Sequence, residues 1–326
     1  MENPAKFPLL YLPRLALDEV ISMMVPFELI NFSKISPRTE RIVQALSARK
    51  RTYEVYLRIT YDPSVTIRGA EVHWEFKPTE DKTKNNVIES HSQDRMLRYE
   101  YSENELQHCK KNYEYIKRIL NFPITSVFYE LSAFVSRNRL IIDWLKSHHE
   151  SVEQLLIYSR TGRDDDLKYL LNNLKSTEYL KIHAQNELHF EWNDLLPQNL
   201  DFLYIEALNN ISFQQLMRTN SKTVILQNSM LTSREINSFL KSWMESKSHS
   251  NLEFFEVNLE NREAMDTILD LPHEYVTYET ARIFKGYKNG RTGICGGIEI
   301  KQSSGKTGVM GHSTNGDKVS LELYIF

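Results

Sequence analysis

Six short apolar segments recur along the chain from residue 124, and they limit its fold more than any other feature. Most follow the pattern apolar-x-x-apolar-x-apolar, although Thr177 and Ser221 stand at the first apolar position in two of them. The segments are ITSVFY (from Ile124), VEQLLI (Val152), TEYLKI (Thr177), LDFLYI (Leu200), SKTVIL (Ser221) and LEFFEV (Leu252), at steps of 28, 25, 23, 21 and 31 residues. Most steps lie within the roughly 20 to 29 residues of a leucine-rich repeat. An ordinary α/β domain with alternating strands and helices is the alternative.

Helical patterns occupy the stretches between the segments. Apolar residues at positions i, i+3, i+4 and i+7 occur twice, at Leu167, Leu170, Leu171 and Leu174 and at Ile236, Phe239, Leu240 and Trp243. Ser212-x-x-Gln215 and Thr232-x-x-Glu235 have the form of capping boxes. A fixed order of strand then helix predicts a parallel sheet. We therefore expect an α/β fold, with a leucine-rich-repeat-like solenoid over residues 105–278 that includes a helix around 106–120.

The flanking regions predict β-structure. Residues 53–61 alternate apolar and polar side chains, and a second alternating run follows Asp62-Pro63-Ser64 and reaches Phe76, which predicts a hairpin. Residues 77–95 are polar and are expected to form a loop or flexible linker, so that 51–104 comprise a β-hairpin and a polar linker. Strands near 281–287, 297–302 and 319–326 are expected to form a β-rich C-terminal cap over 279–326, because open repeat stacks need caps.

Residues 7–36 are rich in apolar side chains but are interrupted by proline and charge. Helices are expected to begin after Pro13, at Pro26 and after Pro37, because proline is tolerated in a first helical turn. About 45 residues of short helices cannot bury all these side chains among themselves. The surplus must pack either on the rest of the chain or on a partner.

The order of residues in this helical stretch resembles the F-box, which docks F-box proteins onto the Skp-type adaptor of cullin-RING ubiquitin ligases. The resemblance covers about residues 7 to 48, within an expected domain at 1–50, and is carried by Leu12-Pro13, Val20-Ile21, Pro26, Glu28-Leu29-Ile30, Ser33, Ser36 and Arg38. The aromatic residue often found after Ser-x-x-Ser is absent, since Thr39, Glu40 and Arg41 stand there. The resemblance implies an adaptor interface formed by Leu12, Pro13, Leu17, Ile21, Pro26, Leu29 and Ile30.

Residues from about 105 to 326 resemble the type 2 F-box-associated domain of the F-box B family. The resemblance is strongest in RLIIDWLKSHHESVEQLLIYS and in the C-terminal FKGY…IEIK…LELYIF. It implies a substrate-recognition subunit of a Skp-cullin-F-box ubiquitin ligase, which binds a protein target while other subunits carry out ubiquitin transfer. The alternative is a leucine-rich-repeat interaction scaffold without a ligase role.

The repeat register predicts where a target binds. Alternate residues of each strand point away from the apolar core, toward the inner wall of the expected solenoid. That wall carries many aromatic side chains among charged ones, a composition typical of interface hot spots. The expected target-binding residues are Phe128, Tyr158, Tyr179, Lys181, Phe202, Tyr204 and Phe254. Equally, the hairpin at 53–76 or the C-terminal strands could cover these rings.

Other function classes find little support. A net charge of -3 gives no reason to expect a nucleic-acid or membrane partner, and no apolar run reaches the roughly 20 residues of a membrane span. Cys109 and Cys295 form no CxxC motif, which fits a cytoplasmic or nuclear protein. Gly305-Lys306-Thr307 lacks the first glycine of a P-loop and is expected to be a hairpin turn. We find no metal ligand set and no catalytic constellation, so no cofactor and no enzymatic activity are expected.

Overall fold

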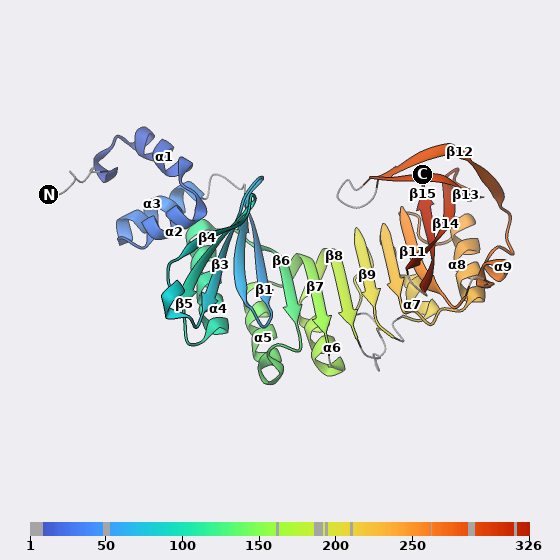
Figure 1. Ribbon diagram of the computed structural model, residues 1–326, viewed down its shortest axis with the longest axis horizontal. Helices are drawn as coiled ribbons and strands as arrows, with labels where there is room; N and C mark the ends of the chain where they lie inside the picture. The colour runs from blue at the N-terminus through green and yellow to red at the C-terminus, as the bar shows by residue number, and fades with distance from the viewer. Residues whose placement is uncertain are drawn as a thin grey trace. The chain divides into compact units, whose positions relative to one another are not determined.

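The computed structural model describes residues 9–47, 53–160, 163–185, 192, 195–208, 211–261, 263–285, 291–315 and 318–326. The chain is a mixed α/β protein that divides into two compact units, Met1–Val127 and Phe128–Phe326. Strand β6 (Ile124–Glu130) begins in the first unit and ends in the second. Figure 1 labels most of the helices and strands of both units. No helix in the described part of the chain has the length and apolar character needed to cross a membrane.

Three short helices follow the turn η1 (Leu9–Tyr11) and open the first unit: α1 (Arg14–Met23), α2 (Pro26–Ser33) and α3 (Pro37–Ser47). The predicted starts are confirmed, with a proline in the first turn of α2 and of α3. The Glu28 side chain accepts a hydrogen bond of 3.0 Å from the backbone N–H of Val25, which closes the first turn of α2. Phe27, Ile30 and Val43 are buried and form the core of this helical segment.

The sheet of the first unit has the order β6-β1-β2-β3-β5-β4. Its remaining strands are β1 (Glu54–Ile59), β2 (Ser64–Arg68), β3 (His73–Thr79), β4 (Ile88–Ser92) and β5 (Arg95–Tyr101), with η2 (Lys82–Lys84) before β4. The predicted hairpin is confirmed as the antiparallel pair β1–β2, and the second alternating run is two strands, β2 and β3. Helix α4 (Glu105–Leu120) confirms the helix expected there, and it buries Cys109, Tyr113 and Ile116.

The prediction of a loop or linker at residues 77–95 is wrong. This stretch contains the end of β3 and all of β4, which pairs with β5. Every residue of β4 is exposed, because β4 is the last strand of the sheet order. A polar composition here therefore marks an edge strand with both faces in water, and edge strands avoid apolar side chains.

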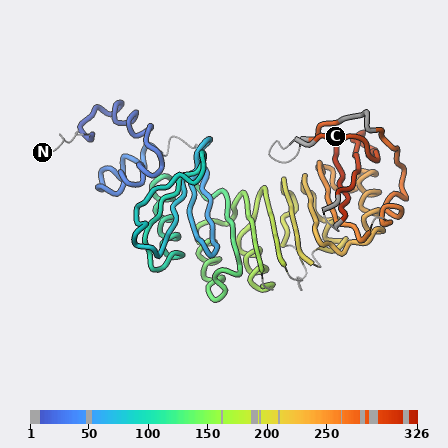
Figure 2. Tube along the Cα trace, viewed as in Figure 1, coloured from blue at the N-terminus to red at the C-terminus, as the bar shows by residue number. Residues whose placement is uncertain are grey.

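Five strands of the second unit run parallel and pair in chain order, as predicted: β7 (Ser151–Ser159), β8 (Lys175–Ala184), β9 (Phe202–Glu206), β10 (Thr223–Gln227) and β11 (Phe254–Leu259). Figure 2 shows this succession in its colours from green to orange. Leu155, Leu180 and Leu203 are fully buried, one on each of three neighbouring strands. The alternation read from the sequence thus separates the core face from the other face.

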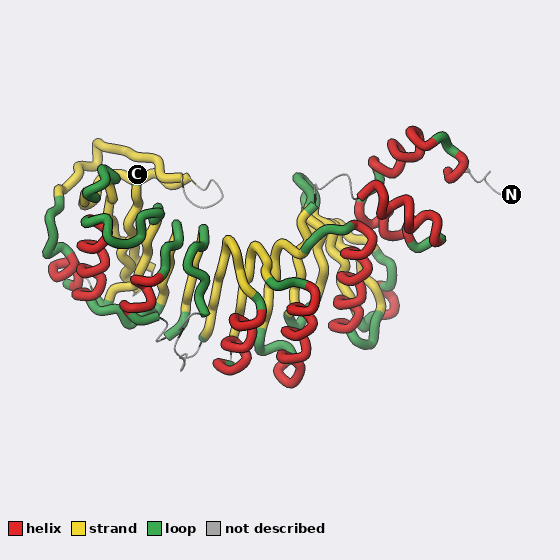
Figure 3. Tube along the Cα trace, turned by 180° about the vertical axis from the view of Figure 1, so that it is seen from behind, coloured by secondary structure: helices red, strands yellow, loops and turns green. Residues whose placement is uncertain are grey.

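Helices of the second unit lie along the core face of this sheet, as Figure 3 shows. They are α5 (Asn138–His148), α6 (Asp164–Asn173), α7 (Phe213–Arg218), α8 (Ser233–Met244) and α9 (Ala264–Ile268), with η3 (Val135–Arg137) before α5. Both predicted capping boxes form at α7 and α8. The three aspartates from Asp164 occupy the first turn of α6, where negative charge is favoured.

Four antiparallel strands complete the second unit: β12 (Glu274–Lys285), β13 (Arg291–Lys301), β14 (Thr307–Asn315) and β15 (Lys318–Ile325). Strand β15 pairs with β11, so these strands extend the sheet directly. Three strands were expected here, and β14 was missed because its glycine and polar residues carry no alternating pattern. The GKT stretch is the predicted hairpin turn between β13 and β14, with Gly305 at φ +100°.

Candidate protein-binding surfaces

The first candidate surface is the N-terminal helical segment, where the structure separates buried from exposed apolar residues. Of the seven residues expected to contact an adaptor, Leu12 is half-buried and Pro13 is exposed. The other five are buried: Leu17, Ile21, Pro26, Leu29 and Ile30. This burial contradicts the exposure that a direct contact requires. Apolar residues at regular helical spacing also form the face by which a helix packs on its own chain.

A different set of apolar side chains faces solvent on the same segment. Tyr11, Leu15, Met23 and Ile35 are 86%, 82%, 81% and 71% exposed, and we call these four residues the exposed apolar set. None of the four was among the residues predicted to contact an adaptor. The sequence does hold one indication that Leu15 is exposed. Its position around the helix falls outside the i, i+3, i+4 series of Leu17, Ile21 and Met24. Exposed apolar side chains gathered within one short segment are typical of a protein-protein contact.

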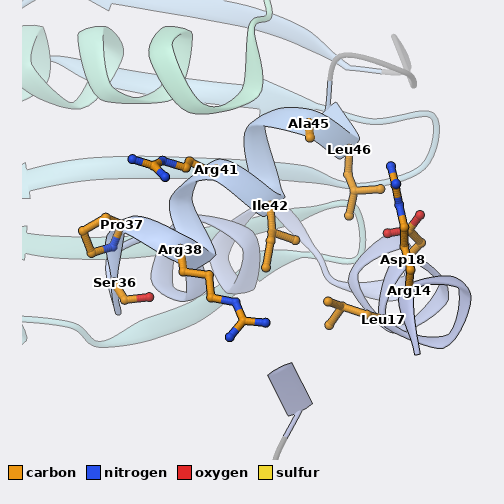
Figure 4. Close-up of a pocket in the computed structure, with 10 residues that line it drawn as sticks. All are labelled: Arg14, Leu17, Asp18, Ser36, Pro37, Arg38, Arg41, Ile42, Ala45 and Leu46. Atoms are coloured by element: carbon orange, nitrogen blue, oxygen red, sulfur yellow. The ribbon is translucent and has the colours of Figure 1, made fainter. Parts of the chain in front are cut away.

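Two cavities lie beside α1. The larger, of about 690 Å³, separates α1 from α3, and its walls combine three arginines with apolar side chains. Figure 4 shows its lining residues, which are Arg14, Leu17, Asp18, Ser36, Pro37, Arg38, Arg41, Ile42, Ala45 and Leu46. The smaller, of about 400 Å³, is lined by residues that include Ile21, Met24, Leu29 and Tyr53. The larger cavity can accept an apolar segment that also carries negative charge.

The second candidate surface is the sheet face opposite the helices of the second unit. Strand register places Tyr179 beside Phe202 and Lys181 beside Tyr204 on β8 and β9. Phe202 and Tyr204 in turn lie beside Thr223 and Ile225 of β10. All seven residues of the predicted target site are half-buried, and we call them the aromatic face: Phe128, Tyr158, Tyr179, Lys181, Phe202, Tyr204 and Phe254. Their common face is confirmed, whereas target binding stays a prediction.

Ring contacts fix the positions of these side chains. Tyr179 and Phe202 stack with a centroid distance of 4.4 Å and an interplanar angle of 5°. Phe128 lies 5.1 Å from Tyr158. The Lys181 ammonium lies 4.4 Å from the centre of the Tyr204 ring, within the range of a cation–π contact. Rings held by their neighbours lose little conformational freedom when a partner binds.

The C-terminal strands cover one end of the aromatic face. Phe284 of β12 is buried, and its ring centre lies 5.9 Å from that of Phe254 and 5.2 Å from that of Tyr324. Phe254 therefore packs against the chain's own C-terminal strands, which was one of the two alternatives for the predicted wall. Sequence alone could not reveal this contact, because it depends on where β12 returns after a separation of thirty residues.

Acidic residues extend the aromatic face along the strands. Glu206 accepts a hydrogen bond of 2.7 Å from the Tyr204 hydroxyl and lies 2.7 Å from Nδ1 of His183. Burial, and then the hydrogen bond to Glu206, raise the pKa of Tyr204. Glu256 of β11 lies directly opposite Glu322 of β15 in the strand register. Burial, followed by the nearby charge of Glu322, raises the pKa of Glu256.

Comparison with known proteins finds similarities in part of the second unit and along much of the chain. Residues 191–257 match the model of a family described as F-box associated, and this stretch includes Phe202, Tyr204, Phe254 and Glu256. The chain is 27% identical over 285 residues to the Skn-1 dependent zygotic transcript 15 protein of Caenorhabditis elegans, an alignment that covers 80% of each chain. No solved structure matches the chain.

Proposed function

We propose that this protein is the substrate-recognition subunit of a Skp-cullin-F-box ubiquitin ligase and contributes no catalytic group. Its N-terminal helices dock a Skp-type adaptor, and its second unit binds a protein target in the cytoplasm or nucleus. The observation that carries the proposal is the exposed apolar set, which lies on a segment that also has a buried apolar core of Ile21, Ile30 and Val43. The match of residues 191–257 to an F-box associated family supports it independently.

Burial of the predicted contacts changes how the docking works. Leu17, Ile21 and Ile30 hold the helices together, and the exposed apolar set meets the adaptor. Covering one large apolar side chain is worth about 1.5 to 3 kcal/mol. Four such side chains supply roughly the 8 kcal/mol of a micromolar complex before the costs of association are counted. Leu12 and Pro13 remain candidates for direct contact, since neither is buried.

The larger cavity beside α1 indicates the chemistry of the docking segment. Among the described residues, Arg14, Arg38 and Arg41 line it with one acidic side chain, Asp18, so its walls favour negative charge. Leu17, Ile42 and Leu46 supply apolar walls. An adaptor segment that is both acidic and apolar fits this lining, and its binding should weaken as salt is added.

The second unit is proposed to act as a leucine-rich-repeat-like target-binding domain. Parallel strands in chain order, each with a buried leucine or isoleucine, support this architecture. The aromatic face supplies rigid rings of the kind that dominate binding energy at interfaces. Two binding surfaces on one chain increase the effective concentration of a target near the ligase, and this proximity is the contribution of the protein to the reaction.

Leu15→Asp combined with Met23→Asp is expected to weaken binding of a Skp-type adaptor about a hundredfold, or roughly 2.7 kcal/mol. The cause is two charges buried without partners in an apolar contact. The two side chains are exposed in the free chain, so the melting temperature should not change. Binding is measured by co-purification and by titration calorimetry with purified adaptor. Leu208→Asp with Met230→Asp is the matched control, since these residues are 46% and 68% exposed in the second unit.

A parent chain that does not bind the adaptor, or a double variant that binds as well as the parent, would contradict the proposal. The second candidate function is then an interaction scaffold without a ligase role, whose helices pack internally and recruit nothing. Burial of five predicted adaptor residues favours this alternative. The scaffold would bind a protein target on the aromatic face with no dependence on the N-terminal helices.

A further inference from the structure

Two carboxylates face each other across neighbouring strands of the second unit without a positive charge between them. Glu256 and Glu322 are paired positions of β11 and β15, and both side chains are half-buried. Like charges at directly opposed positions of an antiparallel pair destabilise a sheet. This arrangement indicates that the two glutamates have a role other than stabilising the sheet.

The hydrogen bonds of the pair leave the charge uncompensated. Glu256 accepts from the Gln227 side chain at 2.5 Å, and Glu322 accepts from the Tyr324 hydroxyl at 2.5 Å. Both donors are uncharged, and no ion pair between described residues reaches either carboxylate. Elsewhere in this region the acids do have basic neighbours, since Glu206 lies against His183 and Glu299 pairs with Arg282.

Aromatic rings lie near the pair. Register places Phe254 opposite Tyr324, two residues before Glu256 along β11, and their ring centres lie 5.0 Å apart. On the other side, Ile225 of β10 separates Glu256 from Tyr204 in the same row of the sheet. A planar guanidinium combines bidentate hydrogen bonds to carboxylates with stacking on aromatic rings, whereas an ammonium group offers only a compact charge.

We propose that this face binds an extended segment of the protein target through an arginine whose guanidinium lies between Glu256 and Glu322. The inference rests on the proposed function of the second unit and adds the chemical class of the target. The charge of an arginine complements the acidic pair, and neighbouring rings contact the flanking residues of the segment. A metal ion is a poorer occupant, because no group of three or more His, Cys, Asp or Glu side chains in the described ranges is placed to hold one.

The test uses the full-length protein and a phage-displayed library of random nonapeptides. Arginine is expected to be enriched among peptides selected on the parent protein. The strongest peptide is then synthesised twice, with arginine and with citrulline, which keeps the shape of arginine but is uncharged. Citrulline is expected to weaken binding at least tenfold in a fluorescence titration. Glu256→Gln with Glu322→Gln is expected to produce the same loss for the arginine peptide and to remove the preference for arginine over citrulline.

Glu245→Gln with Glu253→Gln is the matched control. It removes the same charge from two exposed positions, one at the end of α8 and one immediately before β11. The control variant should bind the arginine peptide as the parent does. The Glu256 and Glu322 double variant should melt at or above the temperature of the parent, because the change removes a repulsion, so lost binding cannot be ascribed to unfolding.

Three results would overturn the inference: no enrichment of arginine, equal binding of the citrulline peptide, or full binding by the Glu256 and Glu322 variant. The double variant Tyr179→Ala with Tyr204→Ala distinguishes a failure of the arginine inference from a failure of the aromatic face to bind any target. If that variant loses the peptide while citrulline and the glutamine changes have no effect, the face binds targets without selecting arginine. Adaptor co-purification is measured in parallel and depends on the first unit alone, so it reports separately on the ligase proposal.

Discussion

Trp243→Ala is expected to lower the free energy of unfolding of the second unit by about 3 to 5 kcal/mol, as is typical when a large core aromatic is removed. Trp243 lies on α8 and is 0% exposed. Its carbonyl oxygen accepts a hydrogen bond of 2.8 Å from the Gln302 side chain, in the turn between β13 and β14. Its ring approaches Gly308 so closely that a Cβ atom there would lie 3.2 Å from it. The side chain therefore joins a helix of the parallel region to the C-terminal strands.

Urea unfolding followed by far-ultraviolet circular dichroism measures this loss without relying on tryptophan fluorescence. Trp144→Ala is the matched control, because Trp144 lies on α5 of the same unit and is only half-buried against His148. The control should cost clearly less than the core variant. Equal losses for the two tryptophans would mean that α8 and the C-terminal strands do not share a core.

Lowering the pH from 7 to 4 is expected to remove about 3 kcal/mol of stability through His249 alone, at 1.36 kcal/mol per pKa unit. His249 is buried, and its Nε2–H donates to the carbonyl oxygen of Leu216 at 3.0 Å. In the described part of the chain its Nδ1 has no hydrogen-bond partner, and its ring lies edge-on to Phe239 at 4.8 Å. Burial lowers the pKa of His249 from 6.5 to about 4, against a smaller opposing effect of the Leu216 hydrogen bond.

The direction of the stability change depends on whether the folded or the unfolded state takes up the proton. Between pH 6.5 and 4 the unfolded chain protonates this histidine while the folded chain keeps it neutral, so stability is lost as the pH falls through that window. His249→Asn removes the titration, and asparagine tolerates the positive φ of 52° at this position. Urea unfolding of both proteins across the pH range isolates the effect, because the carboxylates titrate in each. Parallel stability curves for the parent and the His249→Asn variant would disprove the prediction.

Much of the second unit could be predicted because its structure depends on local patterns. Alternation along a strand and burial of one sheet face are the same physical fact, so Leu180 and Tyr179 could be assigned to opposite faces from sequence alone. Capping boxes and prolines likewise mark helix starts by local chemistry. By contrast, β14 has no alternating apolar pattern, and its pairing with β13 and β15 depends on partners elsewhere in the chain.

The candidate sites were predictable only in part, because exposure is not a local property. Leu15 and Leu29 are both leucines on amphipathic helices, yet one is exposed and the other is buried. The positions of residues around a helix show which of them share a side. They do not show which side is buried by the rest of the chain. Phe254 presents the same difficulty, since its neighbour Phe284 arrives from a distant strand. The acidic pair of Glu256 and Glu322 also depends on a register that only the folded sheet supplies.

Open space beside α1, about 690 Å³ in one cavity and about 400 Å³ in the other, affects how much of the time the helix stays folded. Side chains beside a cavity forgo part of their dispersion attraction, so α1 is held less firmly than a helix in a close-packed core. Its amide hydrogens should therefore exchange with solvent through brief local openings, long before those of strands β8 to β10. A partner that fills either cavity would slow this exchange. Ordering α1 would then cost part of the free energy of binding.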